Sequence, residues 1–135
     1  MDELLGNLWI SPNVNKHTVN GTTYYEFQAG STITSSAFPT TFNLSFIFTL
    51  SNLDLQSSHV IKIVVTRPDG SIADYSENIS KEKIMGFDRT DSITYSGILE
   101  NVQITEKGIY TFDGLVDGTA LSEYKMLFMG VSDNE

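Results

Sequence analysis

The feature that most constrains the fold is a strict two-residue alternation of large apolar side chains between Thr41 and Leu50. Successive side chains of a strand point to opposite faces, so a period of two places these apolar groups on one face. Ile47 is the one large apolar residue out of phase. The run therefore predicts a core strand. Its in-phase members are Phe42, Leu44, Phe46, Phe48 and Leu50.

Further strands are predicted on both sides of this run. Alternation returns over 58–66, and the Pro68-Asp69-Gly70 turn predicts a hairpin to 71–79. Asp117-Gly118 predicts a type I′ turn between the last two strands. The segment 80–91 is the least strand-like part of the chain, and no long amphipathic helix is predicted. The remaining strands are expected over 93–104, 109–116 and 120–131, with weaker ones over 7–14 and 22–29.

About seven to nine short strands in 135 residues predict one all-β sandwich domain over 1–135. The side chains expected to supply most of its core come from the alternating faces of three strands and from the run after Glu106. They are Phe42, Leu44, Phe46, Phe48, Ile61, Ile63, Val65, Tyr110 and Phe112.

The run from Glu106 to Phe112 is similar to the tyrosine corner of immunoglobulin-like sandwiches. In that motif a glycine is followed two residues later by tyrosine, and a core-facing cysteine follows after two more. Phe112 stands at the cysteine position here. The similarity implies that the Tyr110 hydroxyl bonds to upstream backbone and that Phe112 faces the core.

Together with Phe38-Pro39, the Pro68-Asp69-Gly70 turn and Val116-Asp117-Gly118, this corner resembles a family of uncharacterised bacterial and phage-borne immunoglobulin-like domains. The resemblance covers roughly residues 37–131, and 1–36 lie outside it as N-terminal strands of the same domain. It implies an immunoglobulin-like antiparallel β-sandwich. It transfers no catalytic residue to this chain.

The residue types present exclude several kinds of chemistry. The chain has no cysteine, so disulfides, thiolate metal sites and cysteine nucleophiles are ruled out. His17 and His59 are the two near-neutral bases, and neither lies in a catalytic motif. We expect no enzyme activity, no cofactor and no metal. The loop from Asp88 to Ser92 offers oxygen ligands for Ca²⁺ but lacks the density of an EF-hand loop.

No segment is apolar for long enough to be a signal peptide or to span a membrane. The expected location is the cytoplasm, or the host-cell cytoplasm if the chain is phage-encoded.

Charge is spread unevenly along the chain. The formal net charge is −9, of which −7 lies in residues 74–135. This charge opposes binding to nucleic acid or to an anionic membrane, and it favours a protein partner with a basic surface. Acids at or near predicted strand ends are expected to gather where the loops of a sandwich cluster. These candidate contact residues are Asp88, Asp91, Glu100, Glu106, Asp113 and Asp117.

The last predicted strand is apolar on both faces. Such a strand is either covered by another element, such as the N-terminal segment, or it forms an interface with a partner or a second copy of the chain. One face holds Tyr124, Met126 and Phe128, which are candidate contact residues. The other face holds Leu121, Leu127, Met129 and Val131.

Three functions follow from these patterns. The first is a non-catalytic protein-interaction module. The second is a small acidic inhibitor of phage type that blocks a nucleic-acid-binding surface of a host defence enzyme, for example of CRISPR type. The third is a carbohydrate-binding sandwich, which needs exposed aromatic residues. Ionic strength separates the first two, because a charge-driven complex weakens steeply with salt whereas an apolar one does not.

Overall fold

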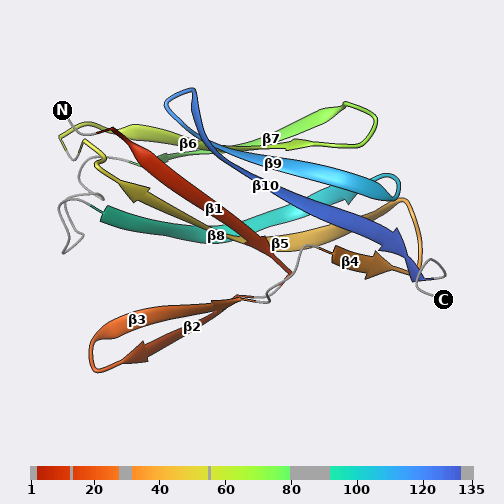
Figure 1. Ribbon diagram of the computed structural model, residues 1–135, viewed down its shortest axis with the longest axis horizontal. Coiled ribbons are helices and arrows are strands. Elements are labelled where there is room, and N and C mark those ends of the chain that lie inside the picture. The colour runs from red at the N-terminus through yellow and green to blue at the C-terminus, as the bar shows by residue number, and fades with distance from the viewer. Residues whose placement is uncertain (1–2, 13, 28–31, 55, 80–91, 132–135) are drawn as a thin grey trace.

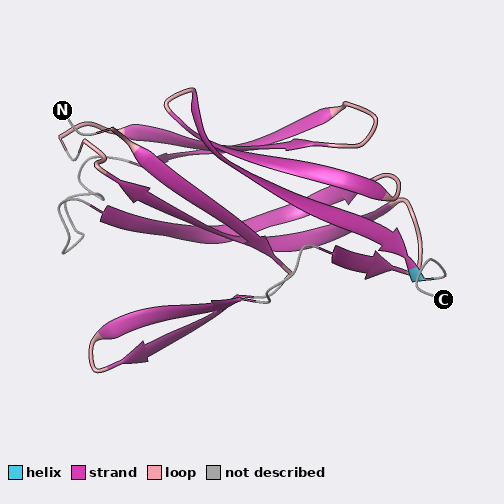
Figure 2. Ribbon diagram, in the orientation of Figure 1, coloured by secondary structure: helices cyan, strands magenta, loops and turns pink. Residues whose placement is uncertain are grey.

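The computed structural model describes residues 3–12, 14–27, 32–54, 56–79 and 92–131. In these ranges the chain forms ten strands and no α-helix (Figure 2). The strands are β1 (Leu5–Ser11), β2 (Val14–Val19), β3 (Thr22–Phe27), β4 (Thr32–Ser35), β5 (Thr40–Ser51), β6 (His59–Thr66), β7 (Ile72–Ile79), β8 (Ser92–Ile104), β9 (Gly108–Val116) and β10 (Thr119–Gly130).

Eight of these strands form two sheets packed face to face (Figure 1). One sheet has the order β1-β5-β8, and the other has the order β4-β10-β9-β6-β7. The predicted all-β sandwich is therefore confirmed.

The core lies between the sheets and is centred on β5. Phe48 is fully buried, and Phe46 is 7% exposed. Two glycines leave room for the Phe48 ring: a Cβ on Gly6 would lie 2.9 Å from it, and a Cβ on Gly114 would lie 2.8 Å from it. Of the predicted core residues, Phe42 alone is only half-buried, although it packs against the core. Ile47, which is out of phase with the alternating core residues of β5, is buried on the outer face of its sheet.

Both predicted hairpin turns are confirmed. Before β7, the Gly70 N–H donates to the Arg67 carbonyl at 2.9 Å, and Gly70 has φ +88°. Between β9 and β10, Asp117 and Gly118 have φ +50° and +84°. Two successive positive φ values are what a type I′ turn requires, so this turn sets the register of β9 against β10 up to the shift between Ala120 and Ser122.

The tyrosine corner is also confirmed. The Tyr110 hydroxyl donates to the Glu106 carbonyl at 2.6 Å and accepts from the Glu106 N–H at 3.2 Å. Tyr110 and Phe112 are both fully buried. Because these bonds satisfy a polar group inside the core, they fix how the chain enters β9.

The structure differs from the expectation in two places. β4 pairs with the end of β10 in parallel, so the sandwich is not wholly antiparallel. The segment 14–19, expected mostly as loop, is strand β2 and pairs with β3 across the Asn20-Gly21 turn. In Figure 1 this β2–β3 hairpin extends away from the two sheets, and it is a separate two-stranded sheet.

Candidate functional site

Strand β10 has one core face and one outer face, and the register shows which is which. Met126 pairs with Tyr110, so Met126 and Phe128 project into the core. Their exposures are 1% and 0%, and Tyr124 packs against the same core. The prediction that Met126 and Phe128 contact a partner is therefore wrong. Neither side chain is available to a partner, because both fill the space between the sheets.

The opposite face of β10 carries an exposed apolar group that we call the outer strip. Leu127 lies directly opposite Ile109 of β9. Ile109 and Val131 are each 56% exposed, and Leu127 and Met129 are half-buried. Leu121 does not belong to it, because the register shifts between Ala120 and Ser122 and Leu121 packs against the core. The outer strip consists of Ile109, Leu127, Met129 and Val131.

Acidic side chains lie on the same face as the outer strip, with the Thr111–Lys125 pair between them and it. Asp113 of β9 is directly opposite Glu123 of β10. Burial raises the pKa of Asp113, Glu123 raises it further, and Lys125 lowers it. Lys125 lies 3.6 Å from Glu123. Like charges directly opposite each other destabilise a sheet, so this pair costs folding stability.

The other predicted acids within the described residues do not gather into one patch. Glu106 precedes β9 and Asp117 follows it, so they lie roughly 30 Å apart at opposite ends of the sandwich. Glu100 lies on β8, in the other sheet. Asp88 and Asp91 fall outside the described residues. Of the four candidate acids that the structure describes, Asp113 is the one on the same sheet face as the outer strip.

Asp117 is held by His59 and acts within the fold. His59 Nδ1 lies 2.6 Å from Asp117 Oδ2, and His59 Nε2 lies 2.6 Å from the Asp54 carbonyl oxygen. Asp117 Oδ1 also accepts the Val60 N–H at 2.8 Å. Since both ring nitrogens face acceptors, this geometry favours the doubly protonated imidazolium form of His59. We call this arrangement the His59 clasp.

The clasp also accounts for the ionisation of its members. Burial on its own would lower the pKa of His59, but the hydrogen bonds to Asp54 and Asp117 raise it above its ordinary value. Burial on its own would raise the pKa of Asp117, but the bonds from Val60 and His59 lower it. His59 is 6% exposed and has both nitrogens occupied, so it is not placed to act as a general base.

His17 lies in β2, and its side chain is outside the described part of the structure. Among the described residues, no three His, Asp or Glu side chains come together as metal ligands. Within the same ranges every buried side-chain polar atom has a hydrogen-bond partner, and no helix is long and apolar enough to cross a membrane.

Sequence reasoning missed Ile109 and Glu123 as surface residues. A signal for Ile109 was present: the tyrosine corner turns Tyr110 inward, so Ile109 must face outward. Glu123 could not be placed from the Asp117-Gly118 turn, because the turn alone puts Ser122 opposite Asp113 and the register shift between Ala120 and Ser122 brings Glu123 there instead.

No known family model matches this chain, and no curated protein matches it. Among solved structures, it is similar to part of the alkylpurine DNA glycosylase of Pseudomonas fluorescens bound to DNA with an abasic site analog, at 10% identity and a TM-score of 0.53. It is also similar to part of a β-glucosidase from Listeria innocua in complex with isofagomine, at 9% identity and a TM-score of 0.52.

Each alignment covers 94% of this chain, which spans 30% of the glycosylase chain and 16% of the glucosidase chain. An immunoglobulin-like protein from Pseudomonas aeruginosa aligns over 94% of this chain and 97% of its own, at 11% identity and a TM-score of 0.42. At these identities the likeness concerns the fold alone. The sheet orders and the tyrosine corner make that fold an immunoglobulin-like β-sandwich.

Proposed function

We propose that this domain is a non-catalytic protein-interaction module that binds its partner through the outer strip. The observation that carries the proposal is the exposure of Ile109, 56%, directly opposite Leu127 on the outer face of the five-stranded sheet. Apolar side chains that gather on a surface mark contact sites, whereas single exposed ones need no explanation. Met129 continues the same face along β10, and Val131 follows directly after the end of the strand.

The charge next to the strip specifies the chemistry of the partner. Asp113 and Glu123 place two carboxylates directly opposite each other, and Lys125 offsets them only in part. A partner that brings a Lys or Arg between these carboxylates removes their repulsion on binding. The partner is therefore a protein with a small apolar patch bordered by basic side chains.

Two variants of matched chemistry test this surface. Ile109→Asp with Leu127→Asp disrupts the outer strip. Ile72→Asp with Ile98→Asp changes two isoleucines that are 64% and 61% exposed and lie on other strands. The four native side chains are exposed or half-buried, and aspartate tolerates solvent, so both variants are expected to fold.

The assay begins with capture of partners from a lysate of the cells that encode the chain, followed by calorimetry with the recovered partner. We expect the strip variant to lose at least tenfold in affinity and the control variant to stay within twofold of wild type. Equal binding by the wild type and the strip variant would overturn the proposal.

A second candidate is the small acidic inhibitor of phage type, which the net charge of −9 supports. Salt distinguishes it from the first. Exposed ion pairs contribute only about 0.2–1 kcal/mol each, so an interface centred on the outer strip loses a few-fold in affinity between low and high salt. A complex formed mainly by charge loses orders of magnitude over the same range.

The carbohydrate-binding alternative requires exposed aromatic side chains on one face. In the described residues, the outer face of the five-stranded sheet carries none. A sugar site on that face therefore has no stacking platform and is not proposed.

A further inference from the structure

The Asn20-Gly21 dipeptide forms the tip of the β2–β3 hairpin. Asn20 has φ +53° and Gly21 has φ +79°, which are the two successive positive values that a type I′ turn requires. Asparagine followed by glycine adopts these values at little conformational cost, so the turn explains why the two residues are adjacent. The same adjacency makes the asparagine side chain chemically labile.

The lability comes from the backbone nitrogen that follows the asparagine. The Gly21 nitrogen can attack the side-chain carbonyl carbon (Cγ) of Asn20. A C–N bond then forms, the bond from Cγ to the amide nitrogen breaks, and the proton lost by the Gly21 nitrogen leaves with the departing ammonia. The five-membered succinimide takes up one water and opens at either carbonyl, to aspartate or to isoaspartate. A side chain on the following residue hinders the attack, and glycine has none.

The hairpin tip is open to solvent. The four residues from Thr18 to Gly21 are exposed, and a Cβ placed on Gly21 would meet no other part of the fold within 4 Å. The hairpin is a separate two-stranded sheet and extends away from the sandwich in Figure 1. A two-stranded hairpin alone is marginally stable, so its turn opens at little cost to the conformation that ring closure needs.

Two other asparagines share the backbone conformation of Asn20 but not its following residue. Asn52 has φ +66° and Asn101 has φ +56°, and both are exposed. Leu53 follows Asn52, Val102 follows Asn101, and both of these apolar side chains are buried in the core. Their bulk hinders attack by the backbone nitrogen, and their packing holds the backbone in place.

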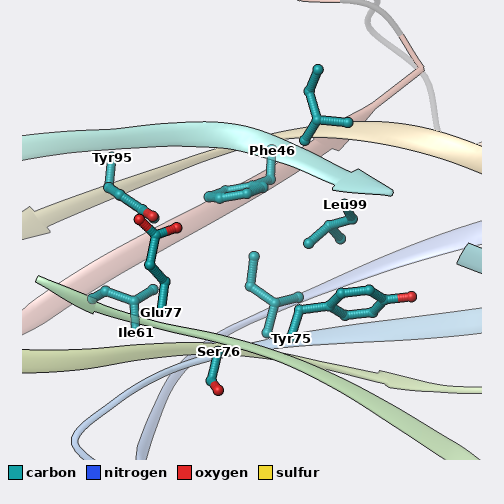
Figure 3. Close-up of a pocket in the computed structure, with 9 residues that line it drawn as sticks. Phe46, Ile61, Tyr75, Ser76, Glu77, Tyr95 and Leu99 are labelled. Atoms are coloured by element: carbon teal, nitrogen blue, oxygen red, sulfur yellow. The ribbon is translucent and has the colours of Figure 1, made fainter. Parts of the chain in front are cut away.

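Asn78 is protected in the same way within a strand. It belongs to β7, the strand that supplies Tyr75 and Glu77 to the groove shown in Figure 3. The residue after it, Ile79, is β-branched and 1% exposed. Asn20 therefore differs from these three exposed asparagines both in the residue that follows it and in its distance from the core.

We propose that Asn20 is a site of spontaneous deamidation, which changes the hairpin irreversibly. The aspartate product keeps the turn, because Asp-Gly also suits type I′, and it adds one negative charge to the tip. The isoaspartate product carries the main chain through the side chain and so adds a carbon to a two-residue turn. Val19 and Thr22, which pair across the turn, then lose their register. This site is independent of the outer strip, which lies on another sheet.

Incubation of the full chain at 37 °C, at pH 6 and at pH 9, followed by peptide mapping with mass spectrometry, measures the reaction at each asparagine. We expect Asn20 to deamidate at least tenfold faster than Asn52, Asn78 or Asn101. The rate is expected to rise with pH, because base removes the proton from the attacking nitrogen. Asn20→Gln is expected to abolish the fast reaction. An Asn20 rate no higher than that of Asn52 and Asn101, or equal rates at the two pH values, would overturn the proposal.

The structural consequence is tested on the isoaspartate form after its separation by chromatography. We expect its two-dimensional NMR spectrum to lose the hairpin signals of Val19 and Thr22 and to keep the signal of Ile109 in the sandwich. Asn20→Asp is the matched control, because it adds the same charge with a normal backbone, and it is expected to keep the hairpin. An isoaspartate form that keeps the hairpin signals, or an Asn20→Asp variant that loses them, would contradict the proposed change.

Discussion

The His59 clasp predicts how the stability of the fold depends on pH. Because the pKa of His59 is raised in the folded chain, folding favours the protonated ring. The stabilisation is therefore fully present below the unfolded value of about 6.5 and is lost as pH rises through the folded value. Each unit by which the folded pKa exceeds the unfolded one contributes about 1.4 kcal/mol at low pH.

The contacts set the size of the effect of removing the side chain. His59 makes one hydrogen bond to a carboxylate and one to a carbonyl, each at 2.6 Å. Hydrogen bonds to charged groups contribute about 1.5–3 kcal/mol each. Asp117 is 49% exposed and regains water when its partner is removed. His59→Ala is therefore expected to cost about 2–4 kcal/mol.

Urea unfolding at pH 6, 7, 8 and 9, followed by the fluorescence of the single tryptophan, Trp9, measures both effects. The wild type is expected to lose stability over this range, and His59→Gln is expected to lose most of that dependence. His17→Gln is the matched control, since it removes the second histidine of the chain and should keep the wild-type slope. An unchanged slope in His59→Gln, or a wild type that gains stability toward pH 9, would refute the reasoning.

Two further changes test the packing that positions the outer strip. Tyr110→Phe removes the hydroxyl that bonds to Glu106 and is expected to cost about 0.5–1.5 kcal/mol in urea unfolding; no change would mean that the corner does not stabilise the start of β9. Gly114→Ala places a Cβ 2.8 Å from the Phe48 ring and is expected to cost about 1–3 kcal/mol, seen as a lower thermal midpoint; an unchanged midpoint would contradict the close contact.

The parts of the fold that the sequence predicted are those with a local signal. The alternation around Phe46 predicts a core strand because a period of two admits few other structures. Asp117-Gly118 predicts its turn because few residues other than glycine and asparagine tolerate positive φ. Tyr110 was placed by its spacing from Gly108, which the corner bonds now explain.

The parts that were missed depend on contacts between distant segments. β4 is a four-residue strand, and its parallel partner is about 95 residues away, at the end of β10. Its short sequence alone carries no sign of that pairing.

Alternation also shows which side chains of β10 share a face, but not which face is inward. For this reason the sequence pattern names Met126 and Phe128 as candidate partner contacts, although it is the opposite face of β10 that carries the outer strip. The local sequence cannot reveal the His59 clasp either, because Asp117 lies 58 residues from its partner.

The most direct test of the central claim is a methyl cross-saturation measurement on the complex with the recovered partner. This experiment reports which methyl groups of the chain lie within the interface. We expect saturation to reach the methyl groups of the outer strip, Ile109 and Leu127 above all, and to spare Ile72 and Ile98. Saturation centred on Ile72 or Ile98, with Ile109 unaffected, would contradict it.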